Sequence, residues 1–428
     1  MQAGGLTLKR SIGGEQMASF YIPLTGLNSD ATALNTIANN LSNMNTTGYK
    51  DQSVSFSDFF YQQIGQTGSG NLIQQGSGVQ TADIASNFTQ GNVNATGTAS
   101  NMAIDGNGFF VLSAGNNDNV YTRNGNFTLN ASGGLVSQDG LAVQGYPATG
   151  GVVNTNAPIG PLTIPVGQVE PPAATTGFSM TANLNSSAAV GTSVPSQITL
   201  YDSLGQSHVA TVTYTKTASN AWSYSIALPP GDQTGAGTTA NTTGTLTFNS
   251  SGNLVTPAAN VTGISFTNLS DGAANLNFSW NLYGNGGNSP LTQVDSASAV
   301  SATNQNGYSS GEYQSFSVNT DGTVMASFSN GQQQAVGRVA LANVTNLQGL
   351  KELGNGEYSV TLASGAAVSG VSGSAGLGTI QGGSLEQSNV NISTEFSNLI
   401  IAQRAFEANS KAVTTFDNVA QDTIDMIH

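Results

Sequence analysis

The feature that most constrains the fold is a pair of long stretches without helix breakers, one near each end of the chain. No Gly or Pro occurs in residues 27–47 or 384–428, although the 428 residues include 53 Gly and 12 Pro. Gly and Pro are the residues that disfavour a helix most, so their absence over runs of this length favours a helix at both ends. Most of the Gly and Pro lie between these stretches, and that middle part must fold differently.

Apolar residues recur with a period of seven at both ends. The N-terminal stripe contains Leu27, Leu34 and Leu41, with Ile37 beside them. The C-terminal stripe contains Ile392, Leu399, Phe406, Val413, Ala420 and Ile427. This period is typical of helices that pack along one another. Two interpretations stay open: the stripes form a pair of core helices in one bundle, or they pack against copies of the chain in neighbouring subunits.

The C-terminal stripe predicts a long helix. A helix over residues 391–427 would extend about 54 Å at the standard helical rise. A compact domain of this size cannot cover that length, so we expect the helix to protrude. Its start is open, because Ser384 and Gln387 fit a capping box while the apolar period begins only at Ile392.

The middle of the chain predicts β structure. An Asn-x-x-Gly turn between alternating apolar residues recurs at 130–133, 249–252 and 319–322. Asn can accept hydrogen bonds from its own turn, and Gly can adopt the positive φ that ends it. The copies are irregularly spaced, which predicts recurring hairpins and not a solenoid. Trp222 and Trp280 are expected to pack the central β domain.

These patterns predict a mainly β protein of several domains. Long N- and C-terminal helices form a coiled-coil end domain, and the β domains consist of hairpins and barrel-like sheets. Pro residues after Tyr146 indicate a boundary near 148, with a return near 303–310. The predicted parts are an extension (1–16), an N-terminal helix (17–47), an extended linker (48–95), an inner β domain (96–147 and 304–384), an outer β domain (148–303) and a C-terminal helix (385–428).

Charge and composition exclude several functions. The chain has 9 Lys and Arg against 23 Asp and Glu, a net charge of −14, and only Arg123 and Lys216 lie between Lys50 and Arg338. Nucleic-acid binding needs clustered bases, so we predict none. No apolar run approaches the roughly 20 residues of a membrane helix, so we predict no membrane insertion. Without Cys, the chain has no disulfide, thiolate metal site or thiol nucleophile.

Candidate groups for chemistry are few. The run 105–110 is rich in Gly, but an apolar strand follows where a phosphate-binding loop needs a helix, so it predicts a structural turn. Asp202 lies among turn residues, and His208 lies beside a predicted strand. These are interpreted as a turn carboxylate and as a surface or hairpin residue. We therefore predict no catalytic residue, no cofactor and no metal site, and the chain is not expected to be an enzyme.

Several separated motifs resemble those of bacterial flagellar axial proteins, the family of rod, hook and hook-associated proteins. They lie in order at residues 39–50, 104–110, 121–127, 140–146, 384–390, 395–400 and 403–411. The residues carried over from the family motifs are Asn39, Asn40, Asn45, Gly48, Tyr49, Asp105, Gly106, Gly108, Phe109, Arg404 and Asn409. Residues 1–16 have no counterpart, because family members begin near Met17.

Within this group, residues 199–208, the strand around Trp222 and residues 340–344 resemble the hook proteins. The resemblance implies a structural subunit that polymerises into the flagellar hook, the flexible universal joint that transmits torque from motor and rod to filament. It implies a place outside the cell, in the hook and basal body, reached through the flagellar export apparatus without a cleaved signal peptide. The implied partners are copies of the chain, the distal rod protein, and the hook cap and hook-filament junction proteins.

The resemblance also implies a mechanism. The terminal helices, unpaired in the monomer, would form an inner tube by coiled-coil packing, and the β domains would form outer layers that slide past one another. Two alternatives remain at this point. One is a distal-rod-like axial protein, which would form straight tubes. The other, from a different class, is a secreted polar β adhesin or glycan-binding module, which would leave the terminal heptads unexplained.

Overall fold

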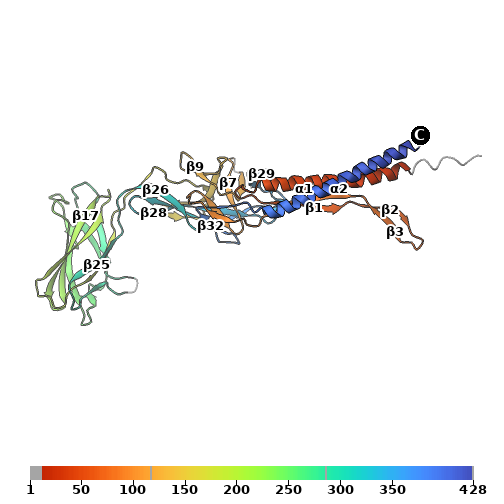
Figure 1. Cartoon of the computed structure of the whole chain (residues 1–428). Coiled ribbons are helices and arrows are strands. Elements are labelled where there is room, and N and C mark those ends of the chain that lie inside the picture. The colour runs from red at the N-terminus through yellow and green to blue at the C-terminus, as the bar shows by residue number, and fades with distance from the viewer. Residues whose placement is uncertain (1–11, 116–117, 285–286, 427–428) are drawn as a thin grey trace, which may run out of the picture. The chain divides into compact units, whose positions relative to one another are not determined.

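The computed structural model describes residues 12–115, 118–284 and 287–426. The chain folds into two compact units, drawn in Figure 1. Unit 1 holds the described residues up to 164, residues 316–326 and those from 334 onward, and unit 2 holds residues 165–315 and 327–333. Each unit is described by itself. Neither long helix of the described chain is apolar enough to cross a membrane.

Unit 1 contains both long helices, α1 (Ile12–Ser42) and α2 (Ile392–Asp425). The N-terminal helix was predicted to continue to residue 47, but it ends at Ser42, and turns follow over residues 43–48. The C-terminal helix begins after Asn391, whose side chain accepts hydrogen bonds from the backbone N–H groups of Ser393 and Thr394. Ser384, the other candidate for the start, lies in a strand.

Residues 48–95 form paired strands, whereas the sequence predicted an extended linker. β1 (Gln52–Asp58) pairs antiparallel with β4 (Val79–Ser86), and β2 (Tyr61–Gln66) pairs with β3 (Leu72–Gly76). β5 (Val93–Ala95) pairs with β33 (Ser384–Glu386). The many polar residues of this segment hide the strand pattern, because exposed hairpins show little apolar alternation.

The main sheet of unit 1 has the strand order β28-β11-β7-β8-β30-β29. Its strands are β7 (Phe109–Ser113), β8 (Asn119–Thr122), β11 (Ala142–Thr149), β28 (Gln333–Asn343), β29 (Lys351–Gly354) and β30 (Glu357–Ser359). Shorter strands extend it: β9 (Thr128–Leu129), β10 (Leu135–Val136), β12 (Val152–Val153), β13 (Gly160–Pro161) and β31 (Val368–Val371). β6 (Met102–Asp105) pairs with β32 (Thr379–Gly382), and a short 3-10 helix spans Leu347–Gly349. Three strands have residues in both units: β26 (Gly311–Val318), β27 (Thr323–Phe328) and β28, whose first residue Gln333 belongs to unit 2.

Unit 2 has two sheets that share one apolar core. The first has the order β16-β17-β18-β20-β21, with β16 (Ser193–Tyr201), β17 (Ser207–Ala218), β18 (Ala221–Ala227), β20 (Thr243–Phe248) and β21 (Leu254–Thr256). The second has the order β19-β22-β23-β15-β24, with β15 (Gly177–Asn183), β19 (Thr239–Ala240), β22 (Val261–Phe266), β23 (Leu276–Trp280) and β24 (Leu291–Thr292). β25 (Ala299–Gln305) pairs with β15, and β14 (Val169–Glu170) pairs with the start of β26.

The core of unit 2 draws on both sheets. Trp222 and Trp280 are each 0% exposed, as the sequence predicted. Their neighbours alternate between buried and exposed along the strands, which is the pattern of a sheet with one covered face. His208 lies in the hairpin of β16 and β17, one of its two predicted places, but it is only 2% exposed and so is not a surface residue.

The recurring turns form as expected. At the second copy, Oδ1 of Asn249 accepts hydrogen bonds from the backbone N–H groups of Ser251 and Asn253, at 2.9 and 3.0 Å. Gly252 then takes a φ of 79°, a region that residues with a side chain rarely adopt. The local sequence therefore favours these turns.

The predicted fold class, mainly β with a helix at each end, is confirmed. The sheets are not barrels, because every strand order found in the described residues is open. The inserted unit begins at 165 and not at 148. Residues 152–161 follow the Gly150-Gly151 turn and return to pair with β11 in unit 1, so Pro147, Pro158 and Pro161 lie inside unit 1 and do not mark its boundary.

Two Leu residues at the same end of unit 2 test its core. Leu200 is fully buried and Leu204 is 62% exposed. We expect Leu200→Ala to destabilise unit 2 by about 3 kcal/mol because it leaves a cavity. Leu204→Ala should change the stability by less than about 0.5 kcal/mol. Urea unfolding followed by Trp fluorescence measures this unit selectively, since both Trp residues lie in it. Equal losses from the two variants would contradict the assigned core.

Candidate functional site at the terminal helices and their junction

The two terminal helices pack along one another within unit 1 (Figure 1). Asn409 on α2 donates a hydrogen bond from Nδ2 to Oδ2 of Asp30 on α1, at 2.7 Å. Gly26 allows this close approach, because a Cβ at that position would lie 2.8 Å from Nδ2 of Asn409. The resemblance implied helices without a partner in the same chain, and the structure instead pairs them.

The predicted apolar stripes are covered only in part. On α1, the partly buried members are Leu27, Leu34, Ile37 and Leu41. On α2, the partly buried members are Leu399, Phe406, Val413 and Ala420. Ile392 is exposed, and Ile427 lies outside the described residues. The helices therefore bury one side of each stripe against each other and leave apolar surface uncovered.

The most buried side chains of α1 include polar ones that the stripe did not predict. Ser29, Thr36 and Asn40 are each less than 9% exposed. Oγ1 of Thr36 donates to the carbonyl of Thr32 at 3.1 Å, so this hydroxyl needs no partner outside the helix. α1 also contacts β1 and β4, which explains why a second face of the helix is covered.

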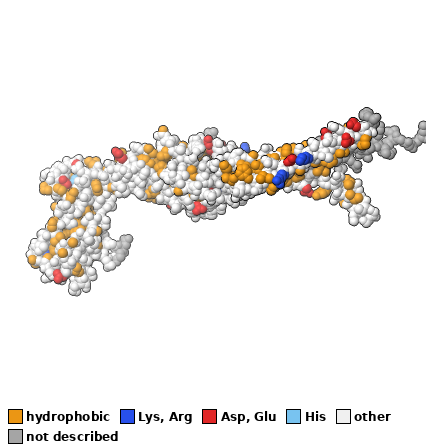
Figure 2. All heavy atoms as spheres, viewed as in Figure 1, with side chains coloured by type: hydrophobic (Ala, Val, Ile, Leu, Met, Phe, Trp, Pro, Cys, Tyr) orange, Lys and Arg blue, Asp and Glu red, His pale blue; other side chains and the backbone are white. Residues whose placement is uncertain are grey.

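One face at the start of α2 is apolar and uncovered. Ile392, Phe396 and Ile400 are spaced four residues apart, which places them on one side of the helix. Their exposed fractions are 46%, 53% and 51%. Figure 2 shows hydrophobic side chains gathered over the helical end of unit 1 on the side in view. A contiguous exposed apolar surface of this kind marks an interaction site. We call these three residues the α2 apolar face.

Three buried charges lie where the helices meet the β structure. Nζ of Lys50 lies 2.7 Å from Oε1 of Glu386, and both side chains are 0% exposed. Nη1 of Arg123 lies 3.6 Å from Oε2 of the same carboxylate. Burial lowers the pKa of Lys50 and of Arg123, and the charge of Glu386 opposes that shift in both. The carboxylate therefore offsets part of the cost of burying the two cations.

Further hydrogen bonds surround this cluster, although Oε2 of Glu386 accepts none from the described residues. Nζ of Lys50 donates to the carbonyl of Thr89 at 2.7 Å, and Nη2 of Arg123 donates to the carbonyl of Gly106 at 2.7 Å. The backbone N–H of Gly91 donates to Oε1 of Glu386 at 2.9 Å. A buried ion pair is stable only with such additional hydrogen bonds. The cluster joins the segment after α1, the end of β8 and the strand before α2.

Gly48 allows the backbone after α1 to pass close to this cluster. Its φ is 69°, and its N–H donates to the carbonyl of Glu386 at 2.8 Å. A Cβ at this position would lie 2.8 Å from the backbone carbon of Arg123. Any other residue would therefore be strained and would push the segments apart.

Asn40 and Tyr49 fix the end of α1 to β1. Oδ1 of Asn40 accepts hydrogen bonds from the Gln52 N–H at 2.9 Å and from the Tyr49 hydroxyl at 3.1 Å. Nδ2 of Asn40 donates to the Gln52 carbonyl at 2.8 Å. Nδ2 of Asn39 donates to the Tyr49 hydroxyl at 3.2 Å. Burial, followed by the charge of Glu352, raises the pKa of Tyr49 to about 12, so the hydroxyl remains a donor.

The other residues of the family motifs lie in a turn, in the core or on the surface. The turn 105–108 joins β6 to β7, as predicted, with a φ above 100° at both Gly106 and Gly108. Phe109 is 3% exposed and lies edge-on to Phe88 and Tyr358. Asn45, Asp105 and Arg404 are exposed.

The sequence did not identify Arg123 and Glu386 as partners of Lys50. Glu386 is 336 residues from Lys50, so no local spacing connects them. One signal was present: Arg123 is one of only two basic residues between 50 and 338. An isolated base of this kind is a candidate for a buried pair, because charged side chains are buried only when they are paired.

Four family models match the chain in succession. They are described as "Flagella basal body rod protein" (residues 20–50), "Flagellar hook protein FlgE/F/G D1 domain" (103–184), "Flagellar basal body protein FlaE D2 domain" (174–308) and "Flagellar basal body rod FlgEFG protein C-terminal" (381–426). The D2 model lies within unit 2, and the models at the two ends cover most of the terminal helices.

Relatives match over nearly the whole chain. The flagellar hook protein FlgE of Salmonella typhimurium is 36% identical over 423 residues, which is 95% of this chain and 100% of that protein. FlgE of Escherichia coli K12 is 34% identical over 95% of this chain and 100% of its own. The crystal structure of Helicobacter pylori flagellar hook protein FlgE2 matches with a TM-score of 0.52 and 15% identity, over 67% of this chain and 99% of that one, and supports the fold alone.

The buried cluster can be tested with Glu386→Gln. This variant leaves Lys50 and Arg123 without their counter-charge, so we expect a loss of about 3–5 kcal/mol in the stability of unit 1. Amide hydrogen exchange at Gly48 and Gly91, which both donate to Glu386, reports it locally. Glu407→Gln is the matched control, because its pair with Lys411 is 67–76% exposed and contributes less than about 1 kcal/mol. Unchanged protection at Gly48 and Gly91 in Glu386→Gln would contradict the assigned role.

A pH dependence follows from Glu395 in the first turn of α2. Its Oε2 is buried without a hydrogen-bond partner in the described part of the chain, and burial raises its pKa above the ordinary 4.5. The folded state then binds the proton more tightly than the unfolded state, so stability falls as the pH rises from 4.5 through the folded pKa. We expect Glu395→Gln to make this slope shallower in urea titrations followed by circular dichroism. Glu407→Gln should keep the wild-type slope, and identical slopes in all three proteins would refute the assignment.

Proposed function

The chain belongs to the flagellar hook protein family, and from that premise we propose how its terminal helices build the hook. The family makes it a structural subunit of the flagellar hook and not an enzyme. The distal-rod-like and adhesin alternatives are not favoured, because the relatives that match over nearly the whole chain are hook proteins.

The proposal is that the α2 apolar face packs against the terminal helices of neighbouring copies to form the inner tube. The observation that carries it is the exposure of Ile392, Phe396 and Ile400, each close to half, on one side of a helix whose other side is occupied by α1. Burying them between subunits would gain about 25 cal/mol for each Å² of apolar surface removed from water. A repeating contact between two different surfaces extends into an open helical polymer.

We assign the buried cluster of Lys50, Arg123 and Glu386 a mechanical role in this polymer. It joins the chain leaving α1 to the strand that leads into α2, and both to the β structure of unit 1. Force applied to the helices would therefore reach the sheet through buried ion pairs and hydrogen bonds. Such a junction suits a subunit that must transmit torque without loosening its helices.

Partners and location follow from the same premise. We propose that residues 17–47 and 385–428 serve the inner tube and that unit 2 lies in an outer layer. The proposed partners are further copies, the distal rod protein, the hook cap and the hook-filament junction proteins. The proposed location is the extracellular hook and basal body, reached through the flagellar export apparatus without a cleaved signal peptide. The support for these assignments is the family match over 95% of the chain.

Assembly tests the α2 apolar face directly. The double variant Phe396→Gln with Ile400→Gln should fail to form tubes in electron micrographs after salt-induced assembly. Its monomer should unfold within about 1 kcal/mol of the wild type, because both positions are half exposed and Gln is a good helix former.

The matched control is Leu362→Gln, which replaces a fully exposed apolar residue outside the helices. It should assemble like the wild type. Normal tubes from the double variant would contradict the proposed packing. Loss of tubes from the control as well would show that apolar exposure in general, and not this helix face, drives assembly.

A further inference from the structure

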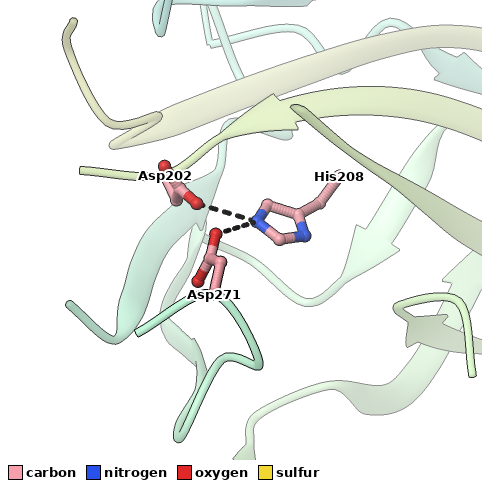
Figure 3. Close-up of side chains that lie close together, drawn as sticks. All are labelled: Asp202, His208 and Asp271. Carbon is pink, nitrogen blue, oxygen red and sulfur yellow. Dashed lines mark hydrogen bonds and ion pairs between the residues drawn. The ribbon is translucent and has the colours of Figure 1, made fainter. Parts of the chain in front are cut away.

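A histidine in unit 2 is surrounded by carboxylates that the hook function does not use. His208 at the start of β17 is 2% exposed. Asp202 follows β16, and Asp271 lies in the connection between β22 and β23. Figure 3 shows both carboxylates directed at the same ring nitrogen. The cluster thus brings together residues attached to the two different sheets of this unit.

The distances suit a shared cation. Nε2 of His208 lies 3.0 Å from Oδ2 of Asp202 and 3.8 Å from Oδ2 of Asp271, and the three ligand atoms lie within 4.8 Å of one another. Ligands of one tetrahedral zinc ion sit about 2.0–2.2 Å from the metal, which puts them about 3.3–3.5 Å apart. The two observed distances to Nε2 bracket that spacing, so small side-chain shifts would complete the site.

The surroundings orient each ligand atom. Nδ1 of His208 lies 2.8 Å from Oδ2 of Asp232, so with a metal ion on Nε2 the Nδ1 atom would carry the hydrogen and donate it to this carboxylate. Histidines that bind metals are held in this way by a carboxylate on the other nitrogen.

Each Asp ligand also has one oxygen occupied by its own turn. Oδ1 of Asp202 accepts from the N–H groups of Leu204 and Gln206, at 2.8 and 3.0 Å. Oδ1 of Asp271 accepts from the N–H of Ala273 at 3.0 Å. The Oδ2 atoms of Asp202 and Asp271 face Nε2 of His208.

One atom of the cluster lacks a partner. Oδ2 of Asp271 is buried and accepts no hydrogen bond from any described residue. A buried carboxylate oxygen without a donor is costly, and a second carboxylate beside it adds repulsion. A bound cation would interact favourably with Oδ2 of Asp271 and with Oδ2 of Asp202 at once.

We propose that Asp202, His208 and Asp271 bind one divalent transition-metal ion, of which zinc is the representative. One imidazole nitrogen and two carboxylate oxygens form a donor set that such ions accept, whereas calcium requires six to eight oxygens. The ion would connect the turn after β16, the start of β17 and the β22–β23 connection, and so fasten the two sheets of unit 2 at this edge. This proposal does not depend on how the helices assemble.

The alternative to a metal ion at this site is a proton on His208. Burial lowers the pKa of His208, but hydrogen bonds to Asp232 and Asp202 outweigh it and raise the pKa, so the metal-free cluster can hold an imidazolium. A protonated histidine and a metal ion satisfy the same carboxylates, and the experiment must separate them.

The test uses the full chain stripped with EDTA and titrated with zinc chloride by calorimetry. We expect one zinc ion per chain and a rise of several degrees in the melting temperature of unit 2, with no response to calcium chloride. Asp271→Asn should weaken zinc binding at least tenfold. Asp295→Asn, an exposed position in the same unit, is the matched control and should bind zinc like the wild type.

Folding is checked independently. Because Asp271→Asn removes one of two adjacent carboxylates, its metal-free form should be at least as stable as the wild type by Trp fluorescence. If that variant does not fold, Asp232→Asn tests the same site by releasing the histidine ring, and it should weaken zinc binding about tenfold or more. A wild type that neither binds zinc nor gains thermal stability would overturn the proposal and leave the proton as the occupant. Equal binding by wild type and the folded Asp variants of the cluster would overturn it as well.

Discussion

The buried pair of Lys50 and Glu386 is the contact on which the architecture of unit 1 depends. It brings together residues 336 positions apart, one just after the N-terminal helix and the other just before the C-terminal helix. Gly48 and Asn40 act beside it, one by allowing close approach and the other by tying the helix end to β1. Both charges are fully buried. If either segment moved away, the other would keep a buried charge without its partner, which is strongly destabilising.

This constraint explains how one chain can combine a firm junction with a surface ready for assembly. The helices are held at their base by buried charges and along their length by each other. Part of their remaining apolar surface, the α2 apolar face, is exposed, and we propose that it packs against other copies. Unit 2 has its own two-sheet core, so its stability does not rest on those helices. Three of its few carboxylates gather around His208.

The sequence predicted those features that depend on interactions between nearby residues. The Asn-x-x-Gly turns, the two helices and the buried Trp residues follow from side-chain chemistry within a few residues, as Asn249 and Gly252 illustrate. Contacts between distant segments were missed. Nothing near Lys50 indicates Glu386, and nothing near His208 indicates Asp232 or Asp271. The unit boundary was placed too early for the same reason, since residues 152–161 pair with β11, the strand that contains Pro147.

The central claim is that the α2 apolar face becomes an interface between copies while the Lys50–Glu386 junction stays intact. A cryo-electron microscopy map of the assembled tube with resolved side chains tests it most directly. The account predicts that Ile392, Phe396 and Ile400 contact the terminal helices of a neighbouring subunit and that Lys50 still meets Glu386 within each chain. A map in which those three side chains face solvent, or in which the ion pair is broken, would contradict it.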